Sequence, residues 1–140
     1  MRILKAVALL FALLGAAPLA AQVQPGNPAG LWRCIVNSSV TSIDLYLQVA
    51  PNQTLLHQGS VVYVNTGRIY NVRGAGRWLL LPPDATANHY TFRFQIQPMD
   101  GNHAIFSIFA GFLGDPNFLG HTFVNNQTGQ STDTRCQRIG

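Results

Sequence analysis

The sequence predicts an all-β protein in which one antiparallel meander of about eight strands closes into a small barrel. After residue 22 no stretch sustains the 3.6-residue apolar period of a helix, whereas alternation of apolar and polar residues recurs along the chain. Residues that favour turns divide these runs at short intervals, which leaves no room for crossover helices. Because closure removes exposed strand edges, we expect a meander of this length to close into a barrel.

The segment before the first strand has the pattern of a cleaved export signal. Met1–Lys5 is short and basic, and an apolar run is followed by small residues that signal peptidases favour. The apolar run is shorter than the roughly 20 residues that span a bilayer. We therefore expect residues 1–21 to be a signal peptide, rather than an anchor or a buried helix. Residues 22–30 would form a flexible leader, and residues 31–140 the barrel domain.

Export without a stable membrane anchor places the protein in the periplasm or the medium, since the Ala/Leu-rich leader is typical of bacteria. Of nine Lys and Arg residues, Arg2 and Lys5 leave with the signal, so seven arginines oppose five aspartates and the formal net charge is +2. The arginines are scattered along the sequence, unlike the clustered basic residues of nucleic-acid binders, and we exclude that class of partner.

Eight or nine runs have strand character. In residues 89–97 the side chains of Tyr90, Phe92, Phe94 and Ile96 share one face. Three runs are apolar on both faces, which indicates strands covered on both sides or strands whose outer face meets a partner. The expected strands are residues 31–36, 43–50, 53–64, 68–73, 76–81, 89–97, 103–112, 118–124 and 132–139.

Glycine, proline and asparagine mark the expected turns. Residues 74–76, Gly-Ala-Gly, are expected to separate two of the strands, and Asp100-Gly101 between two strand-like runs is the strongest hairpin signal. Three Asn-x-Ser/Thr triplets are interpreted as turn residues rather than as glycosylation sites; they begin at Asn37, Asn52 and Asn126.

Cys34 lies in the first expected strand and Cys136 in the last, and these two strands are neighbours in a closed meander. A disulfide is the default for two cysteines in an exported protein. It would span 102 residues of sequence and stabilise the fold by about 4–5 kcal/mol at most in the chain-entropy model. A reactive or metal-binding pair is disfavoured, because neither cysteine has a Cys or His at ligand spacing.

The opening Gly30-Leu31-Trp32 of the first strand resembles the calycins, a group of barrels that includes lipocalins, avidins and small bacterial metalloprotease inhibitors. The resemblance covers the two termini. In lipocalins this tryptophan closes the barrel floor beneath an arginine of the last strand, which implies a structural, barrel-closing role for Trp32 with Arg135 or Arg138. The chain shows neither a second lipocalin motif nor an avidin biotin pattern, so the resemblance implies architecture and not function.

The titratable residues show no pattern that indicates catalysis or metal binding. The histidines fall on four different expected strands, without ligand spacing, and we expect them at the surface or the rim; they are His57, His89, His103 and His121. Asp84, Asp100 and Asp115 lie in turns, Asp44 lies within a strand, and no Gly-x-Ser-x-Gly turn occurs. We therefore expect no catalytic residues, no metal and no cofactor, and a protein that is not an enzyme.

Aromatic side chains remain as candidates for binding. We expect Trp78, Tyr90, Phe92, Phe94 and Phe106 either to fill the barrel or to line a ligand pocket inside it, because eight strands leave room for side chains or one small ligand. The sequence thus predicts an exported, non-catalytic binding module. Its ligand would be a small apolar molecule inside the barrel, or a glycan or protein at the rim.

Three other functions stay open. A proteinaceous inhibitor of an exported hydrolase would act through residues 22–30 or a loop at the barrel mouth such as residues 114–117. A small-barrel enzyme would need two titratable groups within hydrogen-bond reach in a pocket. A structural envelope component would expose an apolar patch or a sheet edge.

Overall fold

The computed structural model describes residues 26–83 and 89–140. The expected signal peptide, its cleavage site, residues 22–25 of the expected leader and Asp84 lie outside the described residues. Within these ranges the chain forms eight strands and no helix long and apolar enough to span a bilayer. The strands are β1 (Gly30–Asn37), β2 (Thr41–Val49), β3 (Thr54–Tyr63), β4 (Ile69–Leu81), β5 (Thr91–Pro98), β6 (Phe106–Phe112), β7 (Phe118–Val124) and β8 (Ser131–Arg138).

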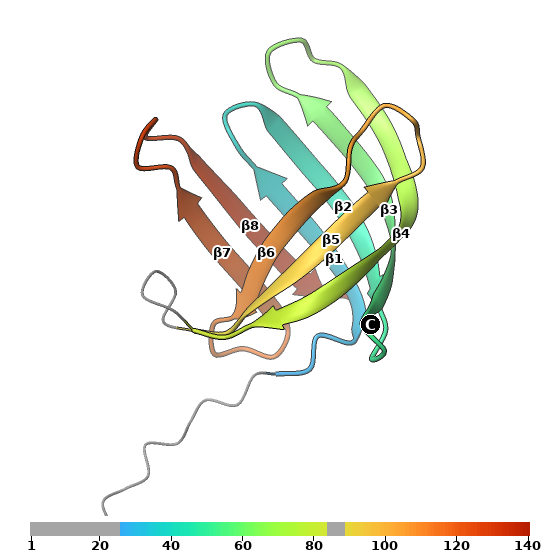
Figure 1. The fold of residues 1–140 in the computed structure, drawn as a ribbon, viewed down its shortest axis with the longest axis vertical. Helices are drawn as coiled ribbons and strands as arrows, with labels where there is room; N and C mark the ends of the chain where they lie inside the picture. Colours follow the sequence, from blue (N-terminus) through green and yellow to red (C-terminus); the bar gives the residue numbers. More distant parts are fainter. Residues whose placement is uncertain (1–25, 84–88) are drawn as a thin grey trace, which may run out of the picture.

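Each strand pairs antiparallel with the next, and β8 returns to pair with β1 (Figure 1). The sheet is a closed barrel, and Cys34 of β1 is bonded to Cys136 of β8. The predicted fold class, an antiparallel meander closed into a barrel with one disulfide between its first and last strands, is confirmed.

Alternation along the strands fills the barrel interior. In β1 the buried residues Trp32, Cys34 and Val36 alternate with exposed ones, and β2 buries every second residue from Ile43 to Val49. Since successive side chains of a strand point to opposite faces, one set forms the core and the other the outer wall. Burial of each large apolar side chain contributes about 1.5–3 kcal/mol, which makes this core the main source of stability.

The expected turn at residues 74–76 is wrong, because β4 is one strand that continues through it. Neither Gly74 nor Gly76 has a positive φ, so neither adopts turn geometry. Both glycines instead leave room for neighbours: a Cβ at Gly74 would lie 2.3 Å from the carbonyl oxygen of Gln97, and one at Gly76 would lie 2.1 Å from that of Gln95. Glycine within a strand marks such close approaches of another backbone.

The two ends of the barrel differ. At the floor, where β1 begins, Trp32 lies beneath the N-terminal segment and the loop of residues 113–117. The expected mouth position of residues 114–117 is therefore wrong, because β6 runs from the mouth to the floor and the loop follows its end. At the mouth lie the loops of residues 38–40, 64–68, 99–105 and 125–130. Figure 1 shows β6 and β7 diverging from the floor toward the mouth.

The strand pairs are unequal in length. The β1–β8 pair has six residue pairs in register, whereas the β6–β7 pair has two, Gly111 with Gly120 and Phe112 with Leu119. We call the first the closed seam and the second the open seam. Toward the mouth, residues 106–110 of β6 and 121–124 of β7 have no strand partner across the open seam.

Candidate functional site on the outer wall

Aromatic side chains fill the part of the barrel interior in which the sequence predicts either core packing or a ligand pocket. Phe92 is 1% exposed and Phe94 is 0% exposed, and the ring of Phe92 makes edge contacts with the rings of Trp78 and Phe112 at 5.9 and 5.7 Å. The indole N–H of Trp78 donates to the carbonyl of Ala50 at 2.7 Å. These residues therefore serve as core.

The other two predicted lining residues are only partly buried. Phe106 packs against the edge of the core, and Tyr90 lies just before β5. Trp78 also lines a cleft on the outside of β4 and β5.

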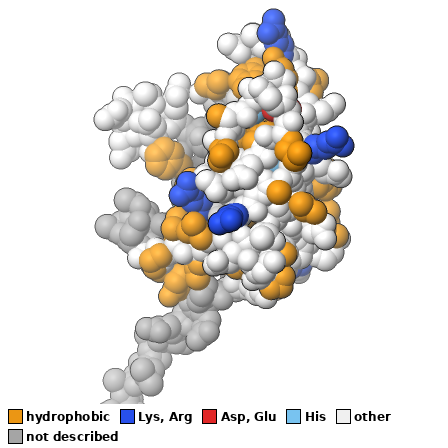
Figure 2. Space-filling view, turned by 45° about the vertical axis from the view of Figure 1, so that its right-hand side comes forward, with side chains coloured by type: hydrophobic (Ala, Val, Ile, Leu, Met, Phe, Trp, Pro, Cys, Tyr) orange, Lys and Arg blue, Asp and Glu red, His pale blue; other side chains and the backbone are white. Residues whose placement is uncertain are grey.

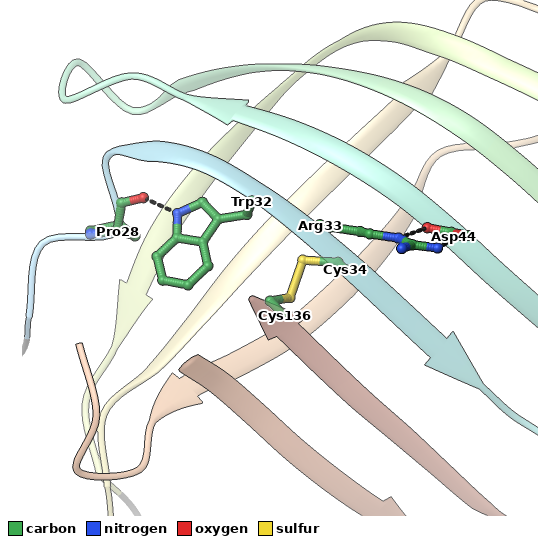
Figure 3. Close-up of a disulfide and its surroundings, with 6 residues drawn as sticks. All are labelled: Pro28, Trp32, Arg33, Cys34, Asp44 and Cys136. Carbon is green, nitrogen blue, oxygen red and sulfur yellow. Dashed lines mark hydrogen bonds and ion pairs between the residues drawn. A yellow bond between two sulfur atoms is a disulfide. The ribbon is translucent and has the colours of Figure 1, made fainter. Parts of the chain in front are cut away.

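Trp32 and Arg138 close the barrel floor. The guanidinium of Arg138 lies 4.3 Å from the centre of the Trp32 ring, an arrangement that contributes about 0.5–2 kcal/mol. The Trp32 indole donates to the carbonyl of Pro28 at 2.7 Å (Figure 3), and Arg138 donates to that of Ala29 at 2.6 Å. The last residues of the expected leader are thus held against the floor rather than flexible, since Pro28 is fully buried.

Arg135 does not close the floor. Its side chain is 84% exposed and pairs with Asp133 at 3.0 Å. The reason is the period of the strand: Cys136 points inward, so Arg135 points outward and Arg138 inward. The resemblance to the calycins implied Arg135 or Arg138 at this position. Because the disulfide holds Cys136 inside the barrel, strand alternation selects Arg138.

The disulfide lies inside the barrel, with Cys34 0% and Cys136 1% exposed (Figure 3). The two residues face each other directly in the closed seam, and their Cα atoms are 4.0 Å apart. Antiparallel residues that share no backbone hydrogen bonds have the closest Cα atoms, which makes this a suitable position for a cross-strand bond. The bond is shielded from solvent and is structural.

His57 lies inside the barrel, so its expected surface position is wrong. It is 4% exposed, and the register sets it beside Gly74, whose missing side chain leaves room for the imidazole. Burial lowers the pKa of His57, and the hydrogen bond to the Gln97 carbonyl at 3.2 Å opposes this only in part. Because a carbonyl accepts, Nε2 carries the proton and Nδ1 is left buried without a partner.

An Asp–His pair orders the mouth. Asp100 accepts from the His103 ring at 2.5 Å and from two backbone N–H groups at 3.0 Å, and the hydrogen bond from His103 lowers the pKa of Asp100. The imidazole stacks on Tyr63 at 5.9 Å and meets the edge of Tyr70 at 5.0 Å. An Asp–His pair can activate a nucleophile, but no hydroxyl or thiol of the described residues hydrogen-bonds to this ring. The pair stabilises the loop of residues 99–105.

No metal site emerges from this arrangement. Within residues 26–83 and 89–140, no group of three or more His, Cys or Asp side chains is placed to hold a metal ion.

The candidate site is a cleft of about 670 Å³ on the outside of β7, β8 and β1, which we call the outer cleft. Its apolar lining includes Ile35, Leu113 and Phe118, which are 37, 67 and 49% exposed. Its charged lining includes Arg33 and Arg135. Arg33 donates to both carboxylate oxygens of its neighbour Asp44, at 3.1 and 2.7 Å (Figure 3), and these bonds lower the pKa of that carboxyl group.

Two histidines stand where the outer cleft meets the open seam. His89 and His121 line the cleft, and their ring centres are 6.4 Å apart. Burial lowers the pKa of His121, and the neighbouring His89 lowers it further. The sequence placed both at the surface or rim but gave no sign that they meet, because 32 residues separate them and only the barrel brings them together.

Exposed apolar side chains continue from the outer cleft along the open seam. Phe109, Phe123, Val124 and Ile105 are 37, 57, 50 and 57% exposed. Apolar side chains are exposed on β3 and β4 as well, where Leu56, Ile69 and Leu79 are 57, 67 and 40% exposed. Figure 2, which brings the right-hand side of Figure 1 forward, shows apolar side chains and separate arginines on a mostly uncharged polar surface. Exposed apolar side chains that gather beside a cleft are typical of a contact surface.

Neither protein-family models, nor curated proteins, nor solved structures give a match to this chain. No pattern in the sequence indicates the outer cleft, because its lining residues come from strands at opposite ends of the chain that only the closed barrel brings together.

Proposed function

We propose that this protein is an exported, non-catalytic binding module that holds a partner protein on its outer wall. The observation that carries the proposal is the contrast between a core filled with fully buried side chains and an outer cleft lined by exposed Leu113 and Phe118. Apolar area on the surface is costly unless a partner covers it, and protein interfaces are enriched in such aromatic and aliphatic residues. Export is supported by the buried disulfide, which is typical of oxidising compartments.

The architecture we propose is calycin-like, supported by the stack of Arg138 on Trp32 at the barrel floor. A small apolar ligand inside the barrel has less support, since Phe92 packs against Trp78 and Phe94 in the interior. A neutral glycan on the outer wall is the remaining alternative.

One observation favours a second, narrower function, inhibition of an exported hydrolase. The loop of residues 113–117 projects Leu113 while its backbone is held in place. Asp115 accepts from the backbone N–H of Asn117 at 2.8 Å, and Arg138 binds the carbonyl of Pro116. An ordered loop with an exposed apolar residue loses little conformational entropy when it binds, which is the requirement for a tight inhibitor.

Photo-crosslinking tests the proposal in the host that exports the protein. A photoreactive phenylalanine analogue replaces Phe118 in the outer cleft, and the matched control carries it at Ile69, which is 67% exposed on β4. We expect a covalent adduct with a discrete polypeptide at position 118 and none at position 69. A retained small molecule in native mass spectrometry, or adducts with carbohydrate alone, would contradict the proposal. Assays of the captured protein for hydrolase activity, with wild type and Leu113→Ala, then test the inhibitor.

A further inference from the structure

We infer that an extended peptide segment of the partner binds in the open seam as an additional strand, between β6 and β7. This inference rests on the proposed function, in that the partner is a protein. It goes further by naming the form in which the partner is recognised, its backbone, and the groups that recognise it.

The β7 edge offers free backbone groups. Asn125 donates its N–H to the carbonyl of Gln130 at 2.8 Å, so odd-numbered residues of this hairpin face β8. In antiparallel strands the direction of the backbone groups alternates from residue to residue. The N–H and C=O groups of Thr122 and Val124 therefore point into the open seam, beyond the last β6–β7 pair.

The β6 edge offers a matching set. Met99 donates its N–H to the carbonyl of Arg73 at 3.0 Å, so odd-numbered residues of β5 face β4 and even-numbered ones face β6. The β5–β6 register pairs even-numbered residues with even-numbered ones. The backbone groups of Ser107 and Phe109 consequently point into the open seam, toward β7.

The side chains around the open seam specify the character of the peptide. On the inner side, Phe123 is 57% exposed although its place in the strand alternation directs it toward the interior. On the outer side, Ser107 accepts from Arg93 at 3.0 Å and Thr122 donates to Asp133 at 2.9 Å, while the exposed Phe109 and Val124 lie on the same face. A strand would place every second side chain over Phe123 on the inner side, where an apolar residue fits, and the others on an outer side of mixed polarity.

The backbone groups decide among the occupants of the seam. Exposed strand edges bind further strands through main-chain hydrogen bonds, while pockets for alternate side chains give specificity. A small apolar molecule could cover Phe123 but could not pair with the N–H and C=O groups of two facing edges. Within the described residues, a second copy of the barrel would offer the strand edges of its own open seam, each of which is flanked by mouth loops. A single extended segment can pair with both free edges on the mouth side of the rings of Phe109 and His121, whose centres are 6.5 Å apart across the seam.

Selection from a phage-displayed library of seven-residue peptides on the disulfide-bonded protein tests the inference. The selected peptides are synthesised, and their affinities are measured with wild type, Val124→Thr and Val124→Pro. Both substitutions remove the valine side chain, but only proline removes the N–H that points into the seam, and proline is tolerated where that group bonds no neighbour. We expect peptides with an apolar residue at every second position, binding to Val124→Thr within about threefold of wild type and to Val124→Pro about tenfold more weakly.

Amide hydrogen exchange supplies the second measurement. Saturating peptide should slow exchange at Ser107, Phe109, Thr122 and Val124 by about tenfold or more. N-methylation of alternate peptide amides, which all point to the same edge, should abolish the effect at that edge. No enriched sequence, equal affinity for the two Val124 variants, or protection elsewhere would overturn the inference. So would a dimer that protects the same four amides and excludes the peptides. Crosslinking at Phe118 is independent of these results: an adduct there without peptide binding would leave the proposed function and remove only the strand addition.

Discussion

The closed seam and the open seam both join antiparallel neighbours of the same sheet, yet they differ in how many contacts hold the two strands together. Six residue pairs, a buried disulfide and the stack of Arg138 on Trp32 hold β1 to β8. Two residue pairs hold β6 to β7, and the strands then separate. The barrel has its disulfide and the stack of Arg138 on Trp32 where the chain ends meet, and these contacts hold the sheet closed although the wall separates between β6 and β7.

The largest expected effect comes from removal of the closed seam's disulfide. We expect Cys34→Ala with Cys136→Ala to lower the free energy of unfolding by about 4–5 kcal/mol at most, because the unfolded chain regains the entropy of a 102-residue loop. Urea unfolding followed by tryptophan fluorescence measures it. Thiol labelling of the wild type under reductant is the control, and it should require urea because the bond is buried. A loss below about 1 kcal/mol would show that the closed seam does not depend on the bond.

Arg138 should give the next effect. Arg138→Met loses the stack on Trp32 and the charged hydrogen bonds to carbonyls of the N-terminal segment, and we expect unfolding to become easier by about 2–4 kcal/mol. The matched control is Arg135→Met, which alters an 84% exposed side chain and should change stability by less than about 0.5 kcal/mol. Equal losses for the two variants would refute the assignment of Arg138 to the floor.

The two glycines of the open seam should differ from each other. A Cβ at Gly111 would lie 2.4 Å from the carbonyl oxygen of Tyr90, whereas one at Gly120 would meet the movable end of Leu113 at 3.1 Å. We expect Gly111→Ala to cost about 2–3 kcal/mol and Gly120→Ala less than about 1 kcal/mol. Thermal unfolding compares them, and a reversed order would mean that β6 and β7 are not joined as described.

The smallest effect is on the pH dependence of stability. The pKa values of His57 and His121 are lowered in the folded state, so the unfolded chain takes up protons first as the pH falls. The contribution of these two histidines to the free energy of unfolding is complete above the pKa of the unfolded chain, about 6.5. It is lost as the pH falls toward their lower pKa values in the folded state. His57→Leu or His121→Leu should flatten the decline of the unfolding midpoint below pH 6.5.

The aspartates define a separate, more acidic range. The pKa values of Asp44 and Asp100 are lowered by Arg33 and His103, so their contribution is lost only as the pH falls below about 4. The histidine variants should follow the wild type in this range. A histidine variant that leaves the slope between pH 6.5 and 5 unchanged would place its ring outside the buried environment.

Local patterns in the sequence were enough for the architecture. Alternation of apolar and polar residues is a property of neighbours along the chain, so it predicted the strands, their inward faces and an antiparallel meander. The positions of Cys34 and Cys136 in the first and last runs then predicted closure, because sequential strands of a barrel bring these two together.

Contacts between distant strands were decided only by the tertiary structure. The register determined that Arg138 rather than Arg135 reaches Trp32, and that Gly74 makes room for His57 inside the core instead of forming a turn. It also determined where pairing between β6 and β7 stops, and so where apolar side chains and backbone groups remain open. No local pattern encodes these features, because each depends on which residue of one strand lies opposite which residue of another after the sheet has twisted and closed.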